Sequence, residues 1–167
     1  MTLANCLGGE TPRPGALGEV IALHGRWYAR HWKFGAYFEA LVARDLGAFL
    51  IEFDPARDGL WIEHDEDGAV SGSLAIVGPR ASAVAARLRW FIVDERMQGR
   101  GLGRKLMRCA MQFCSEIGHR QVTLTTFAGL DAARALYEAH GFRLTDERVD
   151  RSWGVAVTEQ RFDWTAH

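Results

Sequence analysis

The chain has 167 residues, of which 48% are hydrophobic and 25% charged, a composition typical of one folded domain and unlike that of a disordered or fibrous protein. Lysine and arginine total 20 against 21 aspartate and glutamate, so the net charge of -1 offers no general attraction for nucleic acid or an anionic membrane. No apolar stretch approaches the length of a membrane span, and residues 1–18 lack the pattern of a signal peptide, so we expect a cytoplasmic protein without a membrane partner.

The cysteines indicate neither a disulfide framework nor a metal site. Cys6, Cys109 and Cys114 are odd in number, and none belongs to a CxxC or CxxH pair. We therefore expect no metal, and Cys109 and Cys114 are interpreted as small hydrophobic residues on one helix.

The N-terminal third of the chain is predicted to hold an arm, a strand and two helices. Residues 1–18 are rich in glycine and proline and poor in apolar groups, which predicts a loose arm ahead of one domain over 19–167. The apolar run 20–23 predicts a first strand. Apolar residues at helical spacing over 25–53 predict two helices with a break near Gly35.

Strands and helices alternate over the rest of the chain. Asp65-Glu66-Asp67-Gly68 has the composition of a tight turn, so residues 60–63 and 69–77 are predicted to form a β-hairpin. The elements predicted after the hairpin are a buried strand at 88–93, an amphipathic helix at 102–117, a strand at 122–126, a helix at 132–140 and strands at 142–149 and 155–162. This order predicts one mixed sheet of the α/β (α+β) class, covered by helices.

A glycine-rich loop, Gln-Gly-Arg-Gly-Leu-Gly-Arg at 98–104, joins the predicted central strand to the amphipathic helix. Unpaired N–H groups and the dipole at a helix start attract anions, and glycine lets the backbone approach a ligand closely. Positive charge is concentrated there by Arg96, Arg100, Arg104 and Lys105. The loop is therefore predicted to bind a phosphate or pyrophosphate.

Three common nucleotide-binding motifs do not fit this loop. A Walker loop needs lysine after its last glycine, whereas Arg104 follows Gly103. The dinucleotide fingerprint GxGxxG fails because the glycines at 99, 101 and 103 alternate. A kinase glycine loop leads into a strand, and this loop leads into a helix.

The loop does match the Gln/Arg-x-x-Gly-x-Gly/Ala signature of the GNAT superfamily of acyl-CoA-dependent N-acyltransferases, through Gln98, Gly101 and Gly103. The later run ARALYEAHGF at 133–142 resembles the Ala-x-x-Leu-Tyr-x-x-x-Gly-Phe segment of that superfamily. Through LRWFIVD at 88–94 and EQRF at 159–162, the chain is also similar to the acetyltransferase half of proteins that fuse such a domain to a winged-helix regulator. The resemblance implies a GNAT-like, mostly antiparallel mixed sheet with helices on both faces and acetyl-CoA as cosubstrate.

The resemblance also implies which residues hold acetyl-CoA. The strand ending at Ile92 and Val93 is expected to splay from its neighbour, so that its backbone holds the pantetheine arm and the Val93 N–H faces the thioester oxygen. The implied cofactor-binding residues are Ile92, Val93, Gln98, Gly99, Arg100, Gly101, Leu102, Gly103 and Arg104. The sequence departs from the pattern at Leu130, where the superfamily often has an asparagine near the pantetheine arm.

Tyr137 and Val93 are the catalytic candidates. Tyr137 occupies the position of the superfamily's general acid, and a phenol with an ordinary pKa near 10 is protonated at neutral pH and can donate to a departing thiolate. The alternative is a core tyrosine that packs beside Leu136. Val93 would act through its backbone, so its side chain is expected to be replaceable.

The acceptor side is less defined by the sequence. The candidate base and substrate-binding residues are His24, Tyr28, Glu39 and Glu63, in elements that line the acceptor side of this fold. The aromatic residues between Trp27 and Phe38 are interpreted either as an acceptor groove or as core packing between two helices. The expected partner is a small-molecule amine or a protein amino group, and direct nucleic-acid binding is disfavoured.

Two functions remain open at this point. One is an N-acetyltransferase in which the amine attacks acetyl-CoA directly in a ternary complex; the other is a non-catalytic module that senses acyl-CoA or pairs with a regulator. Tyr137 favours the enzyme, because a sensor needs no proton donor. The sequence leaves open the acceptor, the base, and whether the protein is a monomer or a homodimer.

Overall fold

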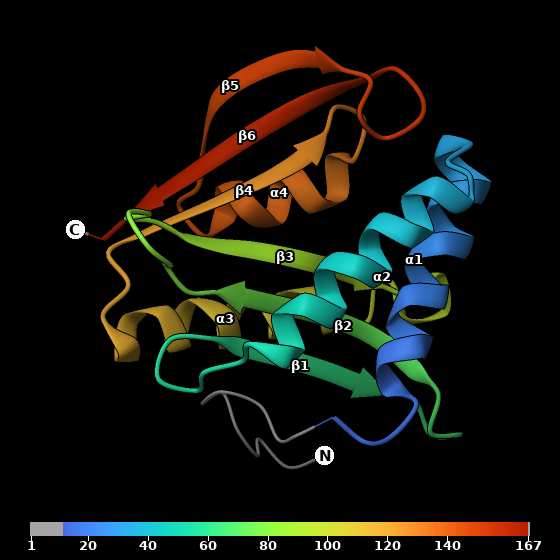
Figure 1. Ribbon diagram of the computed structural model, residues 1–167, viewed down its shortest axis with the longest axis horizontal. Helices are drawn as coiled ribbons and strands as arrows, with labels where there is room; N and C mark the ends of the chain where they lie inside the picture. The colour runs from blue at the N-terminus through green and yellow to red at the C-terminus, as the bar shows by residue number, and fades with distance from the viewer. Residues whose placement is uncertain (1–11, 167) are drawn as a thin grey trace.

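A computed structural model describes residues 12–166. The elements, in chain order, are α1 Ala16–Trp32, α2 Ala36–Ile51, β1 Gly59–His64, β2 Val70–Val77, β3 Ala86–Val93, the 3-10 helix η1 Glu95–Met97, α3 Leu102–Ile117, β4 Gln121–Phe127, α4 Asp131–Ala139, β5 Arg143–Asp150 and β6 Val157–Thr165. The strands form one sheet in the order β1-β2-β3-β4-β6-β5, in which only the β3–β4 pair is parallel (Figure 1). The predicted mixed, mostly antiparallel sheet is therefore confirmed.

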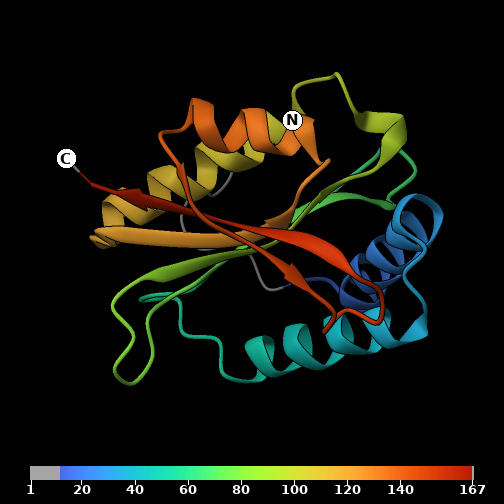
Figure 2. The ribbon, with the colours of Figure 1, turned by 90° about the horizontal axis from the view of Figure 1, so that it is seen from above.

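Helices cover both faces of this sheet. Figure 2 shows α1 and α2 on one side and α3 and α4 on the other. Each face has its own hydrophobic core: Leu46, Phe49 and Trp90 belong to the cluster on the α1/α2 face, and Leu106 and Phe113 to that on the α3/α4 face. Side chains that alternate along the strands supply both cores, which is how one sheet holds two helical layers. None of the helices within residues 12–166 is long and apolar enough to cross a bilayer.

The hairpin and the helix boundaries agree with the expected turn chemistry. The Asp65 carboxylate accepts hydrogen bonds from the N–H groups of Asp67 (3.1 Å) and Ala69 (2.9 Å), which closes the turn between β1 and β2. The first two helices are separated at Gly35, and α3 ends at Gly118 with a φ of 86°. Cys109 and Cys114 are both buried on α3, as predicted.

The predicted strand at 20–23 is wrong, because these residues lie inside α1. Ala16, Val20 and Leu23 are buried, and their spacing places them on one face of a helix. Gly25, where the helical region was predicted to begin, lies within α1, and it allows close packing there: a Cβ at that position would collide with the Glu39 carboxylate of α2.

The boundary of the predicted N-terminal arm also changes. Residues 1–11 lie outside the described residues, so the first part of that prediction is not addressed. From Ala16 the chain is helical, and Arg13 donates hydrogen bonds to Glu19 Oε1 (2.8 Å) and His64 Nε2 (3.0 Å). The segment just before α1 therefore lies against β1 rather than loose.

The centre of the sheet opens between β3 and β4. These strands pair only where Ala86 faces Val122 and Arg87 faces Thr123, and they diverge beyond that point (Figure 1). Their side-chain and backbone groups in the diverging part are thus available to something other than a neighbouring strand.

A bulge in β3 accompanies this divergence. Ser73 faces Ile92 and Ala75 faces Arg89, so Trp90 and Phe91 share one opposing residue on β2. Trp90 has a φ of 50°, a costly conformation for a bulky residue, and its carbonyl accepts a hydrogen bond from the buried Ser73 hydroxyl (2.7 Å). Strained backbone of this kind is concentrated at functional sites, which directs attention to this part of the sheet.

Candidate active site

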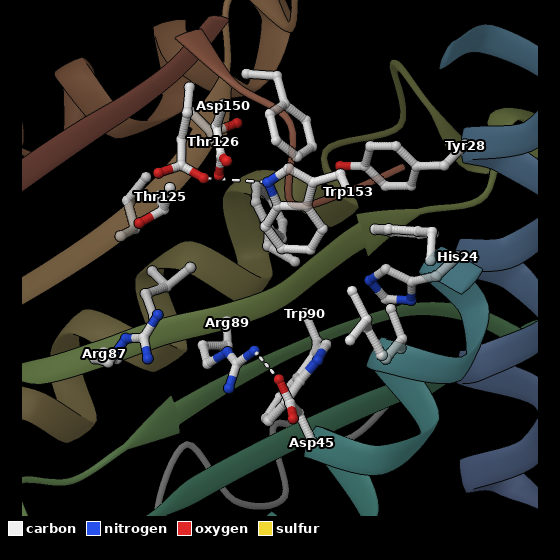
Figure 3. A pocket seen from close by; sticks show the side chains of 18 of the residues that line it. His24, Tyr28, Asp45, Arg87, Arg89, Trp90, Thr125, Thr126, Asp150 and Trp153 are labelled. Atoms are coloured by element: carbon white, nitrogen blue, oxygen red, sulfur yellow. Dashed lines mark hydrogen bonds and ion pairs between the residues drawn. The ribbon is translucent and has the colours of Figure 1, made fainter. Parts of the chain in front are cut away.

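A cavity of about 380 Å³ lies where β3 and β4 diverge, within the size range of sites for small molecules. Its lining comes from α1, α2, β3, β4, α4, the end of β5, the β5–β6 connection and the start of β6. His24 and Tyr28 reach it from α1 (Figure 3), whereas Tyr137, which also lines it, belongs to α4 on the opposite face. The cavity therefore passes through the gap in the sheet and joins its two faces.

The predicted anion loop leads from η1 into α3. Gly99 and Gly101 have φ values of 74° and 84°, a region in which glycine is unstrained, and Gly101 is the N-cap of α3. No side chain of the described residues caps this helix, so the N–H groups of its first turn are left to a ligand or water. The Gln98 side chain donates a hydrogen bond to the Val93 carbonyl (3.3 Å), which ties the loop to the end of β3.

Gly103 has a packing role. A Cβ there would lie 3.1 Å from Leu136 Cδ1 and 3.5 Å from Phe91 Cζ, so a side chain would push α3 away from α4 and β3. Leu102 is buried, and only its backbone can serve a ligand in the loop. The first turn of α3 is thus held close to the gap in the sheet.

The four cations near the loop divide into two groups. Arg96 pairs with Asp94 (3.0 Å) and Lys105 pairs with Glu63 (2.6 Å). Arg100 and Arg104 are exposed and form no ion pair with any residue that the structure describes. Arg100 and Arg104 are therefore the cations available to a phosphate group.

The backbone direction at the end of β3 follows from one hydrogen bond. The Asp94 N–H donates to the Ser71 carbonyl (2.8 Å), and N–H groups alternate in direction along a strand. The Val93 N–H therefore points away from β2, toward the gap between β3 and β4, and the Ile92 N–H points toward β2. The Ile92 side chain is buried in the core, and the residues that line the cavity include Phe91, which was missed, but neither Ile92 nor Val93. The expectation that the backbone of Ile92 and Val93 holds acetyl-CoA stays a prediction.

Tyr137 both lines the cavity and packs in the core, so its position is compatible with a proton donor as well as with a core tyrosine. It is 5% exposed and contacts the rings of Phe91, Phe142 and Phe162 with centroid distances of 5.9–6.2 Å. Burial, with a smaller contribution from Tyr28, raises the pKa of the Tyr137 phenol well above its ordinary value. Tyr137 is thus a protonated donor at every physiological pH.

His24 and Tyr28 face the same cavity from α1. His24 Nδ1 donates to the Val20 carbonyl (2.9 Å), which leaves Nε2 as an acceptor, and burial lowers the His24 pKa to about 4. Burial raises the pKa of Tyr28, and no described residue hydrogen-bonds the hydroxyl of Tyr28 or Tyr137. His24, Tyr28 and Tyr137 therefore offer the cavity one neutral acceptor and two neutral donors at pH 7.

The structure does not bring the other two predicted acceptor residues to the cavity. Glu63 lies on the α3/α4 side of the sheet in its ion pair with Lys105, and Glu39 is exposed on α2, packed over Gly25. The aromatic segment serves both interpretations: Phe34 is buried in the core, whereas Tyr28 and Phe38 also line the cavity. Charged and aromatic residues from distant segments were missed, because no contiguous motif joins them: Asp45, Arg87, Arg89, Arg148, Asp150, Trp153 and Glu159.

Comparison with known proteins agrees with this geometry. A family model described as "Acetyltransferase (GNAT) family" matches residues 22–142. The chain is 35% identical over 137 residues to a mycothiol acetyltransferase of Beutenbergia cavernae, covering 81% of this chain and 43% of that protein. It is 30% identical over 126 residues to a spermine/spermidine N(1)-acetyltransferase of Bacillus subtilis, covering 75% and 68%. The match to human N-acetyltransferase 8 covers 59% of that protein. The chain therefore spans only about half the length of the mycothiol acetyltransferase and of the human protein.

The fold is shared with solved structures at lower identity. A ribosomal-protein-alanine N-acetyltransferase from Brucella melitensis superposes with a TM-score of 0.73 at 17% identity, over 94% of this chain and 98% of that one. At this identity the likeness concerns the fold alone.

Proposed function

This chain belongs to the acetyltransferase (GNAT) family, and we propose that it transfers an acetyl group from acetyl-CoA to the amine of a small acceptor held beneath α1 and α2. One observation carries the proposal: a single cavity in the divided sheet is lined by Tyr137, by β3 up to Phe91, and by α1 and α2. Beyond Phe91, β3 leads to the glycine loop and to the uncapped start of α3, which is suited to bind an anion. Relatives named for mycothiol and for spermine and spermidine support a small-molecule acceptor.

The residues present fit acetyl-CoA. The backbone N–H groups of 98–104 with Arg100 and Arg104 would hold its pyrophosphate, and the backbone of Phe91 and Val93 would hold its pantetheine arm. When bound, acetyl-CoA supplies the thioester whose carbonyl carbon the amine attacks. The Val93 N–H then donates to the carbonyl oxygen as negative charge develops on it.

Tyr137 serves as the proton donor to the departing thiolate. The raised pKa of Tyr137 keeps its phenol protonated, and three aromatic neighbours fix its ring. The hydroxyl has no hydrogen-bond partner among the described residues, so its proton is free to be donated. Tyr28 is a second phenol on the other side of the gap and acts as a polar contact for the acceptor.

His24 positions the attacking amine. Its Nε2 is an acceptor at neutral pH and can accept a hydrogen bond from the amine. Because its pKa is lowered to about 4, His24 stays neutral and is a weak base at neutral pH. No cysteine within residues 12–166 lines the cavity, and Cys109 and Cys114 are buried on α3. These facts support direct attack by the amine in a ternary complex over a route through an acetylated cysteine.

The test combines binding with turnover. Calorimetry is expected to show one acetyl-CoA site per chain, and a panel of small amines is expected to include acceptors that release thiol and gain an acetyl mass. Absence of binding at millimolar acetyl-CoA would refute the proposal. Binding without thiol release on any amine or peptide would instead support the second function, an acyl-CoA sensor, which the similarity to regulator fusions keeps in view.

A further inference from the structure

The acceptor pocket contains an arginine without a counter-ion. Arg87 lies near the start of β3, where its backbone is paired on both sides, opposite Val77 and Thr123. Its side chain lines the main cavity and also a smaller neighbouring cavity of about 270 Å³ between β3, β4, β5 and β6. Figure 3 shows Arg87 at one end of the main cavity and His24 and Tyr28 at the other.

The other arginines in these cavities are neutralised within the protein. Arg89 pairs with Asp45 (3.0 Å), Arg148 with Glu159 (3.2 Å) and Arg161 with Asp163 (3.0 Å). Arg87 forms no hydrogen bond or ion pair with any residue between 12 and 166. Desolvation and the nearby Arg89 lower the pKa of Arg87, and the attraction of Asp45 and Glu159 offsets only part of this effect.

The acids that line the main cavity are largely engaged by neighbouring groups and leave little negative charge for the second ammonium group of a polyamine. Asp146 lines only the smaller cavity, where it is exposed and forms no ion pair with any described residue. Asp45 binds both Arg44 and Arg89, and the Glu159 carboxylate accepts from Arg148 and from Trp153 Nε1 (3.2 Å). Asp150 has no cationic partner among the described residues, but it accepts two hydrogen bonds from Ser152, at its N–H (2.9 Å) and hydroxyl (2.7 Å). The pocket therefore does not favour a polycation.

We propose that the acceptor amine carries a carboxylate, which Arg87 binds at the end of the cavity opposite His24; this inference rests on the proposed function. A planar guanidinium binds a carboxylate through two parallel hydrogen bonds. Thr125 faces Arg87 across the divided sheet and lines both cavities, so its hydroxyl adds a donor to the same group (Figure 3).

The middle of the cavity specifies the body of this acceptor. Phe38, Trp90, Phe127 and Trp153 also line the cavity, and Figure 3 shows Trp90 and Trp153 between its two ends. Arg87 and Phe91 are four residues apart on β3, about 13 Å along an extended strand. The acceptor is thus an apolar or aromatic amine whose carboxylate lies several bonds from the amino group.

Matched acceptors test this directly. Benzylamine and 4-(aminomethyl)benzoate share an amine and a ring and differ by a carboxylate; pentylamine and 6-aminohexanoate form a second pair, and spermidine represents polycations. We expect kcat/KM to favour the carboxylate member of at least one pair about tenfold or more, the size of one charge-assisted contact. In Arg87→Ala this preference should fall below about threefold, whereas Arg87→Lys should retain part of it. Arg108→Ala, at an exposed position on α3, is the control and should keep the wild-type preference.

A binding measurement makes the result independent of turnover. NMR titration of the acetyl-CoA-loaded protein with benzoate and hexanoate should show saturable binding of at least one carboxylate, weakened about tenfold or more by Arg87→Ala. Three outcomes would overturn the inference. They are a preference for spermidine or for the amines without a carboxylate, a carboxylate preference that survives Arg87→Ala, and the absence of saturable carboxylate binding. The proposed function would still stand in each case if acetyl-CoA binds and any amine is acetylated.

Discussion

The two faces of the sheet build their parts of the site in different ways. On the α3/α4 face the proposed contacts for acetyl-CoA come from one continuous stretch, the end of β3, the loop 98–104 and the first turn of α3. On the α1/α2 face the pocket is assembled from side chains as far apart in sequence as His24, Asp45, Arg87 and Trp153. The first region acts mainly through backbone groups, and the second through side chains.

This difference explains which part of the site can change. Backbone N–H groups at a helix start require glycine and a fixed turn, so many substitutions there remove binding altogether. A pocket of side chains from separate elements can exchange one charge at a time while the sheet stays intact. We therefore expect substitutions on the α3/α4 face to affect acetyl transfer to every acceptor, and substitutions on the α1/α2 face to affect the choice of acceptor.

Tyr137→Phe should have the largest effect, because Tyr137 reaches the gap from the α3/α4 face. Turnover should fall by roughly 10² to 10⁴, the usual contribution of general acid catalysis, while acetyl-CoA affinity barely changes. Burial raises the Tyr137 pKa, so the wild-type rate should show no alkaline decline from this phenol up to pH 10. Tyr28→Phe is the control on the opposite face and should lose less than about tenfold. Equal losses in the two variants, measured by steady-state kinetics, would remove the distinction.

His24→Gln tests the α1/α2 face through stability. The pKa of His24 in the folded protein is about 4, below the ordinary value of 6.5, so His24 binds a proton at higher pH in the unfolded chain than in the folded one. The wild type should therefore lose about 3 kcal/mol of folding stability as pH falls from 6.5 to 4. Denaturant unfolding of His24→Gln should show a flatter dependence in that window. His140→Gln is matched, since His140 makes the same bond to a carbonyl four residues earlier (2.9 Å) without full burial, and it should keep the wild-type slope.

Arg104→Ala should weaken acetyl-CoA binding about tenfold or more, because a charge-assisted hydrogen bond contributes roughly 1.5 to 3 kcal/mol. Arg96→Ala removes a neighbouring charge that is already paired with Asp94, and calorimetry should find its affinity within about threefold of wild type. The reverse ranking of these variants would mean that the unpaired arginines do not face the ligand.

Gly101→Ala and Gly118→Ala compare the two ends of α3. Both glycines have φ near +85° and neither has backbone in the way of a Cβ, so each substitution should cost about 1 to 2 kcal/mol of stability. Only Gly101→Ala should also weaken acetyl-CoA binding. An equal loss of affinity in both variants would trace the effect to helix strain rather than to contact with the ligand.

The same contrast governs what the sequence could predict. The glycine loop, the helix after it and the strand before it are encoded by local periodicity and turn chemistry, and their predicted positions are confirmed. The strand predicted at 20–23 failed because four residues of an amphipathic helix, read alone, do not reveal its period. Arg87 and Trp153 could not be found, because only the register of β3 and the β5–β6 connection bring them to one cavity. Phe91 was missed at the cavity, since the bulge at Trp90 shifts the alternation of β3 and leaves no trace in composition.

A crystal structure with coenzyme A bound is the most direct test of the central claim that the two faces meet at the gap between β3 and β4. We predict the pyrophosphate at the N–H groups of the first turn of α3 with Arg104 beside it, and the thiol in the gap within hydrogen-bonding distance of Tyr137. A thiol that lies outside the gap, or a pyrophosphate bound elsewhere than at the start of α3, would contradict the account.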